Sequence, residues 1–275
     1  MRNEIIAFNP SKRFPAISLS NSCALNCEHC RGIYLRGMLF VKTPEELYSM
    51  ALKLEENGMY GFLLSGGYDL NGRLLNIEKF IPTLKRIKKD TDLKILLHSS
   101  FLPKNIVEEI STFVDRVSVD IIGSDETYRE VMHLNVGVEA LVNLINIYED
   151  LGVDYAPHLI AGIHYGKIVG ERKAIEILKD RNFRNFVFLT LIPTKNTPME
   201  NVELDWDEIL QILKETKVIK ARKLLGCMRV RNPMLEIEAV KNGYEGIVLP
   251  TKEAREYLMN NGYRLIEKDI CCAMV

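Results

Sequence analysis

The chain lacks long hydrophobic runs and carries almost no net charge. No apolar stretch in its 275 residues approaches the roughly 20 residues that a membrane-spanning helix needs. The formal net charge is −1, with 36 basic and 37 acidic residues, so no basic excess favours nucleic acid or an anionic membrane. Residues 1–14 are polar and charged, unlike a secretory signal. These absences predict a cytoplasmic protein with no nucleic-acid partner and no membrane partner.

Linkers, internal repeats and low-complexity tracts are also missing. With 47% hydrophobic and 27% charged residues, a chain of this length can bury one large core. We therefore expect one domain over residues 15–262, preceded by an extension at residues 1–14. Residues 263–275 are expected to form a tail.

The six cysteines do not have the pattern of a disulfide framework. Three of them, Cys23, Cys27 and Cys30, follow one another in the spacing C-x3-C-x2-C. Three thiolates on one short loop can hold three irons of a cubane cluster, whereas a 4Fe–4S cluster normally takes four cysteines. No fourth cysteine lies nearby in the sequence, so one iron would stay open for a substrate or cofactor.

A zinc site is the alternative interpretation of this loop. Structural zinc takes four nitrogen or sulfur ligands, which usually come in two spaced pairs. His29 could be the fourth ligand, but it is wedged between Cys27 and Cys30. The spacing therefore favours an iron–sulfur cluster.

The cysteine loop resembles the signature of the radical S-adenosylmethionine (SAM) superfamily, in which an aromatic residue precedes the last cysteine. His29 fills that place. The resemblance implies that Cys23, Cys27 and Cys30 hold a 4Fe–4S cluster whose open iron chelates the amino and carboxylate groups of SAM. An electron from the cluster would then cleave the C–S bond of SAM to give a 5′-deoxyadenosyl radical. The protein would position the cofactor and exclude water, and an electron donor such as a ferredoxin is implied.

Hydrophobic period and turn residues predict eight strands that alternate with helices. The strands are expected at Pro15–Ser20, Gly61–Ser65, Leu93–His98, Arg116–Ile121, Asp154–Ala161, Asn185–Thr190, Ala221–Leu225 and Gly246–Leu249. The helices are expected at Thr43–Asn57, Ile77–Lys89, Lys104–Ser111, Asp125–Met132, Val138–Leu151, Gly170–Asp180, Trp206–Glu215, Met234–Lys241 and Lys252–Asn260. Such alternation indicates an α/β fold with parallel strands, and the length fits a (β/α)8 TIM-type barrel in which the last unit can be incomplete. A doubly wound open sheet is the alternative.

Glycines at one strand end are candidates for contact with SAM. In barrel enzymes the chemistry lies at the carboxyl ends of the strands, and the second expected strand runs into Gly66 and Gly67. The resemblance maps this pair onto the family's Gly-Gly motif, which contacts the SAM amino group. Tyr68 stands where the family often has glutamate. An ordinary strand-ending turn is the alternative.

Polar residues on the fourth expected strand are further candidates. Ser118 and Asp120 point the same way along a strand, and polar groups inside a barrel need partners. The resemblance assigns them to the SAM ribose, while a satisfied polar layer is the alternative. Arg129, on the following helix, could pair with the SAM carboxylate or lie in solvent. His98 and His158 are expected to be hydrogen-bonded core residues.

Two later loops complete the expected SAM site. Gly166 and Gly170 form a Gly-x-Ile-x-Gly pattern that matches a family motif around the adenine. Pro193 begins a loop that also contains Thr-Pro and resembles the corresponding loop of the biotin synthase-like branch, where the backbone packs around adenine. No residue is predicted to be catalytic in its own right.

A second set of cysteines consists of Cys227, just past the seventh expected strand, and the adjacent pair Cys271 and Cys272. If the tail folds back over the barrel mouth, these three thiolates could hold a second iron–sulfur cluster, with a fourth ligand from another residue or a substrate sulfur. Arg229 and Arg231 would lower their pKa values. The alternative is three unrelated cysteines.

The second set bears on the reaction, because sulfur-inserting radical enzymes use an auxiliary cluster as the sulfur donor. The run Gly-Cys-Met-Arg at 226–229 and the Cys-Cys tail resemble the archaeal two-component lipoyl synthases. That resemblance implies sulfur insertion into a protein-bound octanoyl chain, with a second radical SAM subunit and an octanoylated carrier protein as partners. Another biotin synthase-like activity, a methylase or C–C lyase in cofactor biosynthesis, would not need these cysteines. A noncatalytic zinc-binding module is the alternative outside enzymes.

Overall fold

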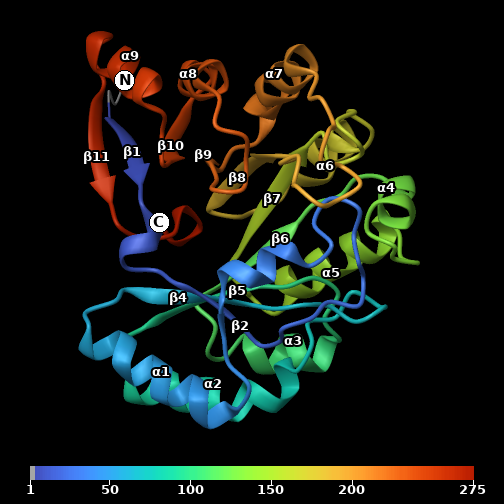
Figure 1. Cartoon of the computed structure of the whole chain (residues 1–275), viewed down its shortest axis with the longest axis vertical. Coiled ribbons are helices and arrows are strands. Elements are labelled where there is room, and N and C mark those ends of the chain that lie inside the picture. Colours follow the sequence, from blue (N-terminus) through green and yellow to red (C-terminus); the bar gives the residue numbers. More distant parts are fainter. Residues whose placement is uncertain (1–3) are drawn as a thin grey trace.

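All strands of the described chain are parallel and form one curved sheet. The computed structural model describes residues 4–275, in which eleven strands follow the spatial order β11-β1-β10-β9-β8-β7-β6-β5-β4-β2-β3 (Figure 1). The strands are β1 (Glu4–Phe8), β2 (Ala16–Ser18), β3 (Leu39–Phe40), β4 (Gly61–Ser65), β5 (Lys94–His98), β6 (Arg116–Asp120), β7 (Tyr155–Ala161), β8 (Asn185–Thr190), β9 (Arg222–Leu225), β10 (Tyr244–Val248) and β11 (Arg264–Lys268). Consecutive parallel strands place their carboxyl ends at one edge of the sheet.

Helices cover the outside of this sheet (Figure 1). They are α1 (Pro44–Glu56), α2 (Ile77–Asp90), α3 (Lys104–Ile110), α4 (Asp125–Glu130), α5 (Val138–Asp150), α6 (Glu171–Leu178), α7 (Trp206–Glu215), α8 (Pro233–Lys241) and α9 (Lys252–Asn260). Helix α2 buries Ile77, Phe80, Ile81, Leu84 and Ile87, a spacing that keeps one helical face against the sheet.

The start of α1 shows how local sequence fixes a helix. The Thr43 hydroxyl accepts the Glu46 N–H at 3.2 Å, and Pro44 occupies the first turn, where its missing N–H costs nothing. The Glu46 carboxylate accepts the N–H of Lys42 at 2.7 Å, one residue earlier than a capping box requires.

The α/β class and the TIM-type arrangement are confirmed, and the eight expected strands and nine expected helices all form. The sheet does not close within residues 4–275, because β3 and β11 are its two unpaired edges. It is therefore an open barrel, and the short strands β2 and β3 form one side of the opening.

The two ends of the chain correct the expected domain boundaries. The expected extension supplies β1, which pairs with β10 on one side and β11 on the other. The expected tail supplies β11, whose register runs from Glu4 opposite Arg264 to Phe8 opposite Lys268. Residues 1–3 lie outside the described part of the chain. Both terminal segments are thus integral to the sheet.

Strand β8 separates two layers of the core. Phe186 and Phe188 pack with the helices in the larger outer cluster, whereas Val187 and Leu189 belong to an inner cluster inside the barrel. This inner cluster also contains Cys272 and Ala273, so the end of the chain folds into the barrel interior. A strand that is buried on both faces has a nearly continuous run of apolar residues, and the sequence of β8 has such a run.

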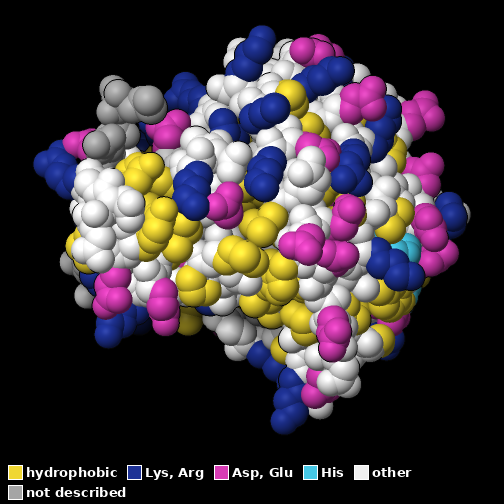
Figure 2. Space-filling model, turned by 90° about the horizontal axis from the view of Figure 1, so that it is seen from above, with side chains coloured by type: hydrophobic (Ala, Val, Ile, Leu, Met, Phe, Trp, Pro, Cys, Tyr) yellow, Lys and Arg dark blue, Asp and Glu magenta, His cyan; other side chains and the backbone are white. Residues whose placement is uncertain are grey.

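None of the described helices is long and apolar enough to cross a bilayer. Figure 2 shows acidic and basic side chains intermixed with apolar patches on the face drawn, which agrees with the near-zero net charge.

Candidate active site

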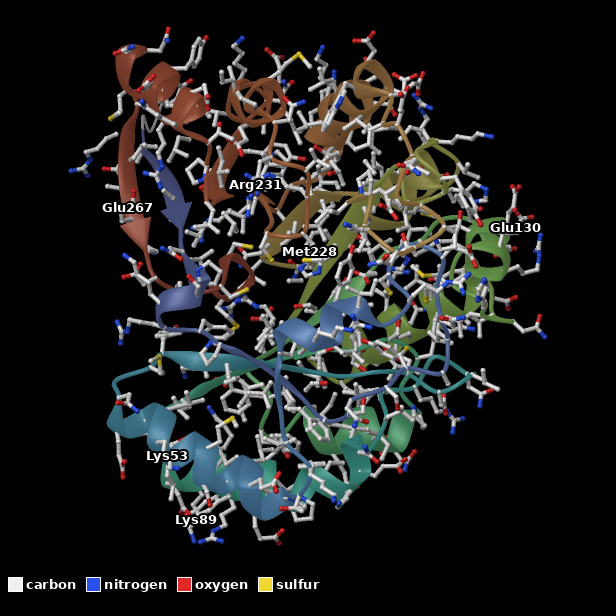
Figure 3. The ribbon with its side chains drawn as sticks, in the orientation of Figure 1. Lys53, Lys89, Glu130, Met228, Arg231 and Glu267 are labelled. Atoms are coloured by element: carbon white, nitrogen blue, oxygen red, sulfur yellow. The ribbon has the colours of Figure 1, made fainter. Side chains whose placement is uncertain are left out.

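One cavity inside the barrel brings the two sets of cysteines together. Its volume is about 330 Å³, and all six cysteines of the chain line it. The first set comes from the loop after β2, and the second from the loop after β9 and from the end of the chain. In Figure 3 the labelled Met228, which follows Cys227 and also lines the cavity, lies near the middle of the ribbon.

Backbone contacts hold the first cysteine loop in place. The Tyr68 N–H donates to the Cys23 sulfur at 3.3 Å, and the Glu28 N–H donates to the Val131 carbonyl at 2.9 Å. Cys27 is buried, and its thiol contacts the Met132 carbonyl at 3.5 Å. The loops after β4 and α4 therefore position the three sulfurs at the cavity wall.

The electrostatics of this loop favour a thiolate. The Cys27 thiol donates to Cys30, and with a smaller contribution from His29 this lowers the pKa of Cys30 to about 4 despite partial burial. The same pairing, together with burial, raises the pKa of Cys27. This pairing favours the thiolate form of Cys30, which is the form that binds a metal.

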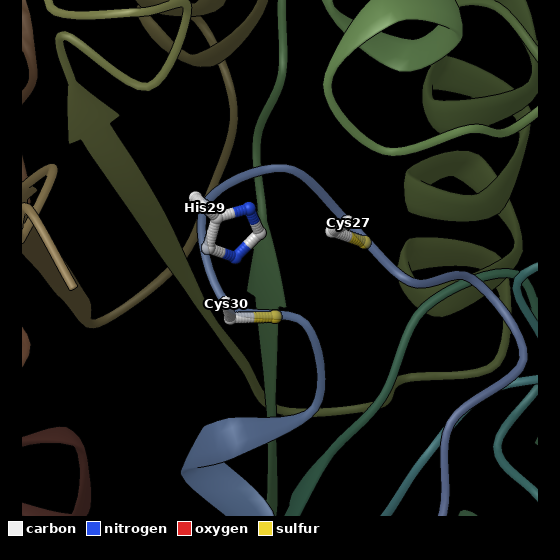
Figure 4. Close-up of side chains that lie close together, drawn as sticks. All are labelled: Cys27, His29 and Cys30. Atoms are coloured by element: carbon white, nitrogen blue, oxygen red, sulfur yellow. The ribbon is translucent and has the colours of Figure 1, made fainter. Parts of the chain in front are cut away.

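His29 lies in the same bend of the loop. Figure 4 shows it between Cys27 and Cys30, with its ring and the Cys30 side chain turned to the inner side of the bend. Ligand atoms of the three residues lie within 4.8 Å of one another, and Nδ1 of His29 is buried without a hydrogen-bond partner in the described structure. Three of the four donors that a zinc site here would need thus lie together, and Cys23 is not among them.

The two candidate glycines have different surroundings. Gly66 lines the cavity, whereas Gly67 packs against the cysteine loop, and a Cβ atom on it would lie 1.9 Å from the Ser22 carbonyl oxygen. The Gly67 N–H donates to the Ser20 hydroxyl at 2.7 Å. The close approach of the Gly67 backbone to the cysteine loop therefore explains why glycine is needed at this position, without any contact with a ligand.

Ser118 and Asp120 both line the cavity, as expected. The Ser118 hydroxyl is fully buried and has no hydrogen-bond partner within residues 4–275, so it is available to a ligand. Asp120 instead lies between two histidines: its carboxylate is 3.5 Å from Nε2 of His98 and 3.7 Å from Nδ1 of His158.

The three groups around Asp120 influence one another. Burial raises the pKa of Asp120, but the two imidazoles outweigh burial and hold it well below its usual range. Burial acts to lower the pKa of His98, yet the Asp120 charge raises it overall, whereas burial lowers the pKa of His158. Both histidines, expected to be core residues, line the cavity.

The remaining predicted SAM contacts do not lie at the cavity wall. Of the residues the structure describes, Gly67, Arg129, Gly166, Gly170 and Pro193 are not among those that line it, and Arg129 is exposed on α4. The two later loops do reach the cavity, through Ile163 and Ile192. Gly166 and Gly170 are required by backbone packing, since a Cβ atom would lie 2.4 Å from Glu203 and 2.7 Å from Gly123 respectively.

The second cysteine set differs from expectation in its charge. Burial raises the pKa of Cys227, outweighing Arg231 and Arg229. Cys227 is exposed by surface area, but the surface that water reaches lies within the cavity. A bond from the Cys272 thiol lowers the pKa of Cys271, and the pKa of Cys272 is raised by the same pairing. The expected lowering by arginine is therefore wrong for Cys227, where desolvation dominates.

Two buried polar residues hold the end of the chain in the barrel. The Arg116 guanidinium donates to the backbone oxygens of Ala273 and Val275 and to Asp154. The Asn185 amide donates to the same two backbone oxygens at 3.1 and 2.6 Å. These contacts place Cys271 and Cys272 at the cavity, and sequence reasoning missed both residues because neither lies in a motif.

A family comparison decides between iron–sulfur and zinc chemistry. The model of the radical SAM superfamily matches residues 17–169, more than half of the chain. The chain belongs to the radical SAM superfamily. Membership implies a 4Fe–4S cluster and SAM, and three cysteine sulfurs beside the unpartnered Ser118 hydroxyl fit them.

A curated relative and several solved structures resemble this radical SAM chain. It is 22% identical over 234 residues to tRNA-2-methylthio-N(6)-dimethylallyladenosine synthase of Neorickettsia sennetsu (strain ATCC VR-367 / Miyayama), a match that covers 76% of this chain and 49% of the relative. The chain thus spans about half the length of that relative.

The structural matches agree with the fold. Methylornithine synthase superposes with a TM-score of 0.63 at 14% identity, over 96% of this chain and 84% of that chain. HydG, a maturase of the [FeFe]-hydrogenase, superposes with a TM-score of 0.66 at 13% identity, over 96% of this chain and 64% of HydG. Streptococcus suis SuiB bound to S-adenosylmethionine superposes with a TM-score of 0.55 at 16% identity, over 73% of this chain and 46% of SuiB. At such identities these matches support the fold alone.

Proposed function

We propose that this radical SAM enzyme inserts sulfur into unactivated carbons of a protein-bound octanoyl chain, as one component of a lipoyl synthase. The observation that carries the proposal is that Cys227, Cys271 and Cys272 line the same cavity as Cys23, Cys27 and Cys30. Two sets of three thiols around one cavity can hold a SAM-binding cluster and an auxiliary, sulfur-donating cluster.

The cavity wall between the two sets supports an apolar substrate. Aliphatic side chains on neighbouring strands form part of the lining, beside the polar group around Asp120; they are Leu63, Leu96, Ile160, Val187 and Leu189. Such a wall binds an alkyl chain by burying it and keeps water away from reactive carbon. The similar Neorickettsia protein is named for a methylthio product, which is compatible with sulfur chemistry here.

Each group of residues has a distinct task in this proposal. When bound, the first cluster and SAM supply the radical chemistry that removes hydrogen from carbon. Cys23, Cys27 and Cys30 hold that cluster, while Gly66 and Ser118 contact SAM in the adjoining cavity. The second cysteine set holds the auxiliary cluster. The barrel excludes water from the reacting carbon, which protects it from side reactions.

The proposal includes three partners. A ferredoxin-type donor would reduce the first cluster, an octanoylated carrier protein would deliver the chain, and a second radical SAM subunit would complete the enzyme. A methylase or C–C lyase with this barrel remains the competing function, and it would need only the first cluster.

Metal content and two variants test the proposal. Anaerobically reconstituted protein should contain about eight irons, since each cluster holds four. The Cys271→Ala/Cys272→Ala variant should keep about four irons and cleave SAM, but form no C–S bond on an octanoylated carrier supplied with the partner subunit.

The matched control is Cys27→Ala, which should lose SAM cleavage while the second cluster remains. A wild-type content of about four irons, or sulfur insertion by the double variant, would contradict the assigned reaction. Neither result would affect membership of the superfamily.

A further inference from the structure

His98 and Asp120 are the last residues of β5 and β6, and His158 lies beside them in the middle of the adjacent strand β7. In the sheet register His98 pairs with Ser118, and Asp120 pairs directly with His158. All three side chains line the cavity, and one ligand atom of each lies within 4.8 Å of the other two. Two imidazoles and one carboxylate therefore converge inside the barrel.

The spacing of the three groups is that of ligands around a cation. The carboxylate oxygens of Asp120 are 3.5 Å from Nε2 of His98 and 3.7 Å from Nδ1 of His158. A charge-assisted hydrogen bond would bring such atoms to about 2.7–2.9 Å. Two ligands at the usual bond length to a tetrahedral zinc-like ion lie about 3.4 Å apart.

The neighbours of His98 occupy one of its two ring nitrogens. The hydroxyl oxygens of Tyr68 and Ser65 lie 3.1 and 3.4 Å from Nδ1 of His98 and 3.3 Å from its carbonyl oxygen. Nε2 is therefore the ring nitrogen that faces the Asp120 carboxylate. An outer hydrogen-bonding partner on the other ring nitrogen is typical of a metal-ligating histidine.

We propose that His98, Asp120 and His158 bind one divalent first-row transition cation, of the Fe²⁺ or Zn²⁺ class, with a remaining coordination position open to the cavity. Two nitrogens and one carboxylate oxygen suit these cations, whereas Mg²⁺ and Ca²⁺ prefer oxygen ligands alone. The proposal does not depend on the second cluster or on the substrate. It assigns Asp120 to the cation and leaves Ser118 as the residue available for the SAM ribose.

The cation can be counted with Co²⁺ as the probe. Full-length protein with reconstituted clusters is dialysed against micromolar Co²⁺, and bound cobalt is measured together with iron. Wild type should bind one cobalt per chain with unchanged iron, and X-ray absorption at the cobalt edge should show nitrogen and oxygen neighbours without sulfur. Asp120→Asn and His158→Gln should each weaken cobalt binding by at least tenfold.

Asp115→Asn is the matched control, because Asp115 immediately precedes the same strand at its opposite end. That variant should bind cobalt as wild type does. Sulfur neighbours would place the cobalt on cysteines and overturn the proposal, as would cobalt binding that Asp120→Asn and His158→Gln leave intact. If Asp120→Asn weakened SAM binding but left cobalt binding unchanged, Asp120 would be a ligand of the SAM ribose and the cation proposal would be wrong. Iron content reports separately on the two clusters.

Discussion

Gly67 shows how a single position can match a family motif and still be explained by packing. Its backbone runs so close to Ser22 and Cys23 that a Cβ atom would overlap both. The same residue donates its N–H to Ser20, at the end of the strand that leads into the cysteine loop. The strand-end turn after β4 thus supports the metal-binding loop mechanically, whatever SAM contacts lie beside it.

The ionisation of Asp115 should make the stability of the fold depend on pH. Burial raises the pKa of its carboxyl, but the Ile95 N–H at 2.8 Å and the ammonium groups of Lys88 and Lys94 outweigh burial and hold the pKa below its usual value. A lowered folded-state pKa stabilises the fold above the unfolded pKa, and this stability is lost as pH falls through the folded value. Asp115→Asn should therefore cost about 1–3 kcal/mol at pH 7.

Denaturant unfolding at several pH values measures this difference, which should shrink below about pH 4, where the unfolded carboxyl is protonated. The control is Glu176→Gln, which removes an exposed pair with Lys173 and should change stability by less than about 1 kcal/mol. A cost for Asp115→Asn that stays constant with pH would refute the electrostatic account.

The helices and strands were predictable because each carries a local signal. Apolar spacing marked α2, capping residues marked α1, and continuous apolar runs marked β4 and β8. Strands β1 and β11 carry weaker signals. Each has five residues. β11 pairs with β1, and β1 pairs with β10 and β11, so both depend on contacts between opposite ends of the chain. Pairing of that kind cannot be inferred from local period.

The residues of the candidate site were likewise predictable where a local pattern marks them and not where long-range pairing positions them. Spacing revealed the first cysteine set, and strand period placed Ser118 and Asp120 toward the interior. The roles of His98 and His158 depend on the register of three strands, which sequence does not specify. The roles of the loop glycines stay predictions: Gly166 and Gly170 are packed closely against other backbone, while the neighbouring Ile163 reaches the cavity.

A buried ion pair connects the Cys227 loop to α8. The side chains of Arg229 and Glu236 are both fully buried and paired, and Arg229 also donates to the Val248 carbonyl at 2.9 Å. The other Glu236 oxygen accepts the Thr251 N–H and hydroxyl, both at 2.7 Å. Burial lowers the pKa of Arg229 to about 10, so it stays charged at neutral pH.

Arg229→Met should therefore destabilise the fold by about 3–5 kcal/mol, because it leaves the Glu236 charge buried without its partner. Thermal and denaturant unfolding measure the change. The double variant Arg229→Met/Glu236→Gln should recover part of the loss, since the uncompensated charge is gone. Equal stability of the single variant and wild type would show that the pair contributes nothing to this loop.

The last residues of the chain lie inside the open barrel, where they form part of the cavity wall. Cys272 and Ala273 pack in the inner cluster, and Asn185 on β8 holds the backbone oxygens of Ala273 and Val275. Asn185→Ala removes both bonds, at a cost of about 1–3 kcal/mol, although Arg116 still donates to the same two oxygens. The local loss should appear as hydrogen exchange at residues 271–275 that is about tenfold faster or more. Asn146→Ala, which removes an exposed contact with Arg181, is the control and should leave that exchange unchanged. Unaltered protection in Asn185→Ala would mean that the Arg116 bonds and apolar packing suffice to keep Cys271 and Cys272 at the cavity.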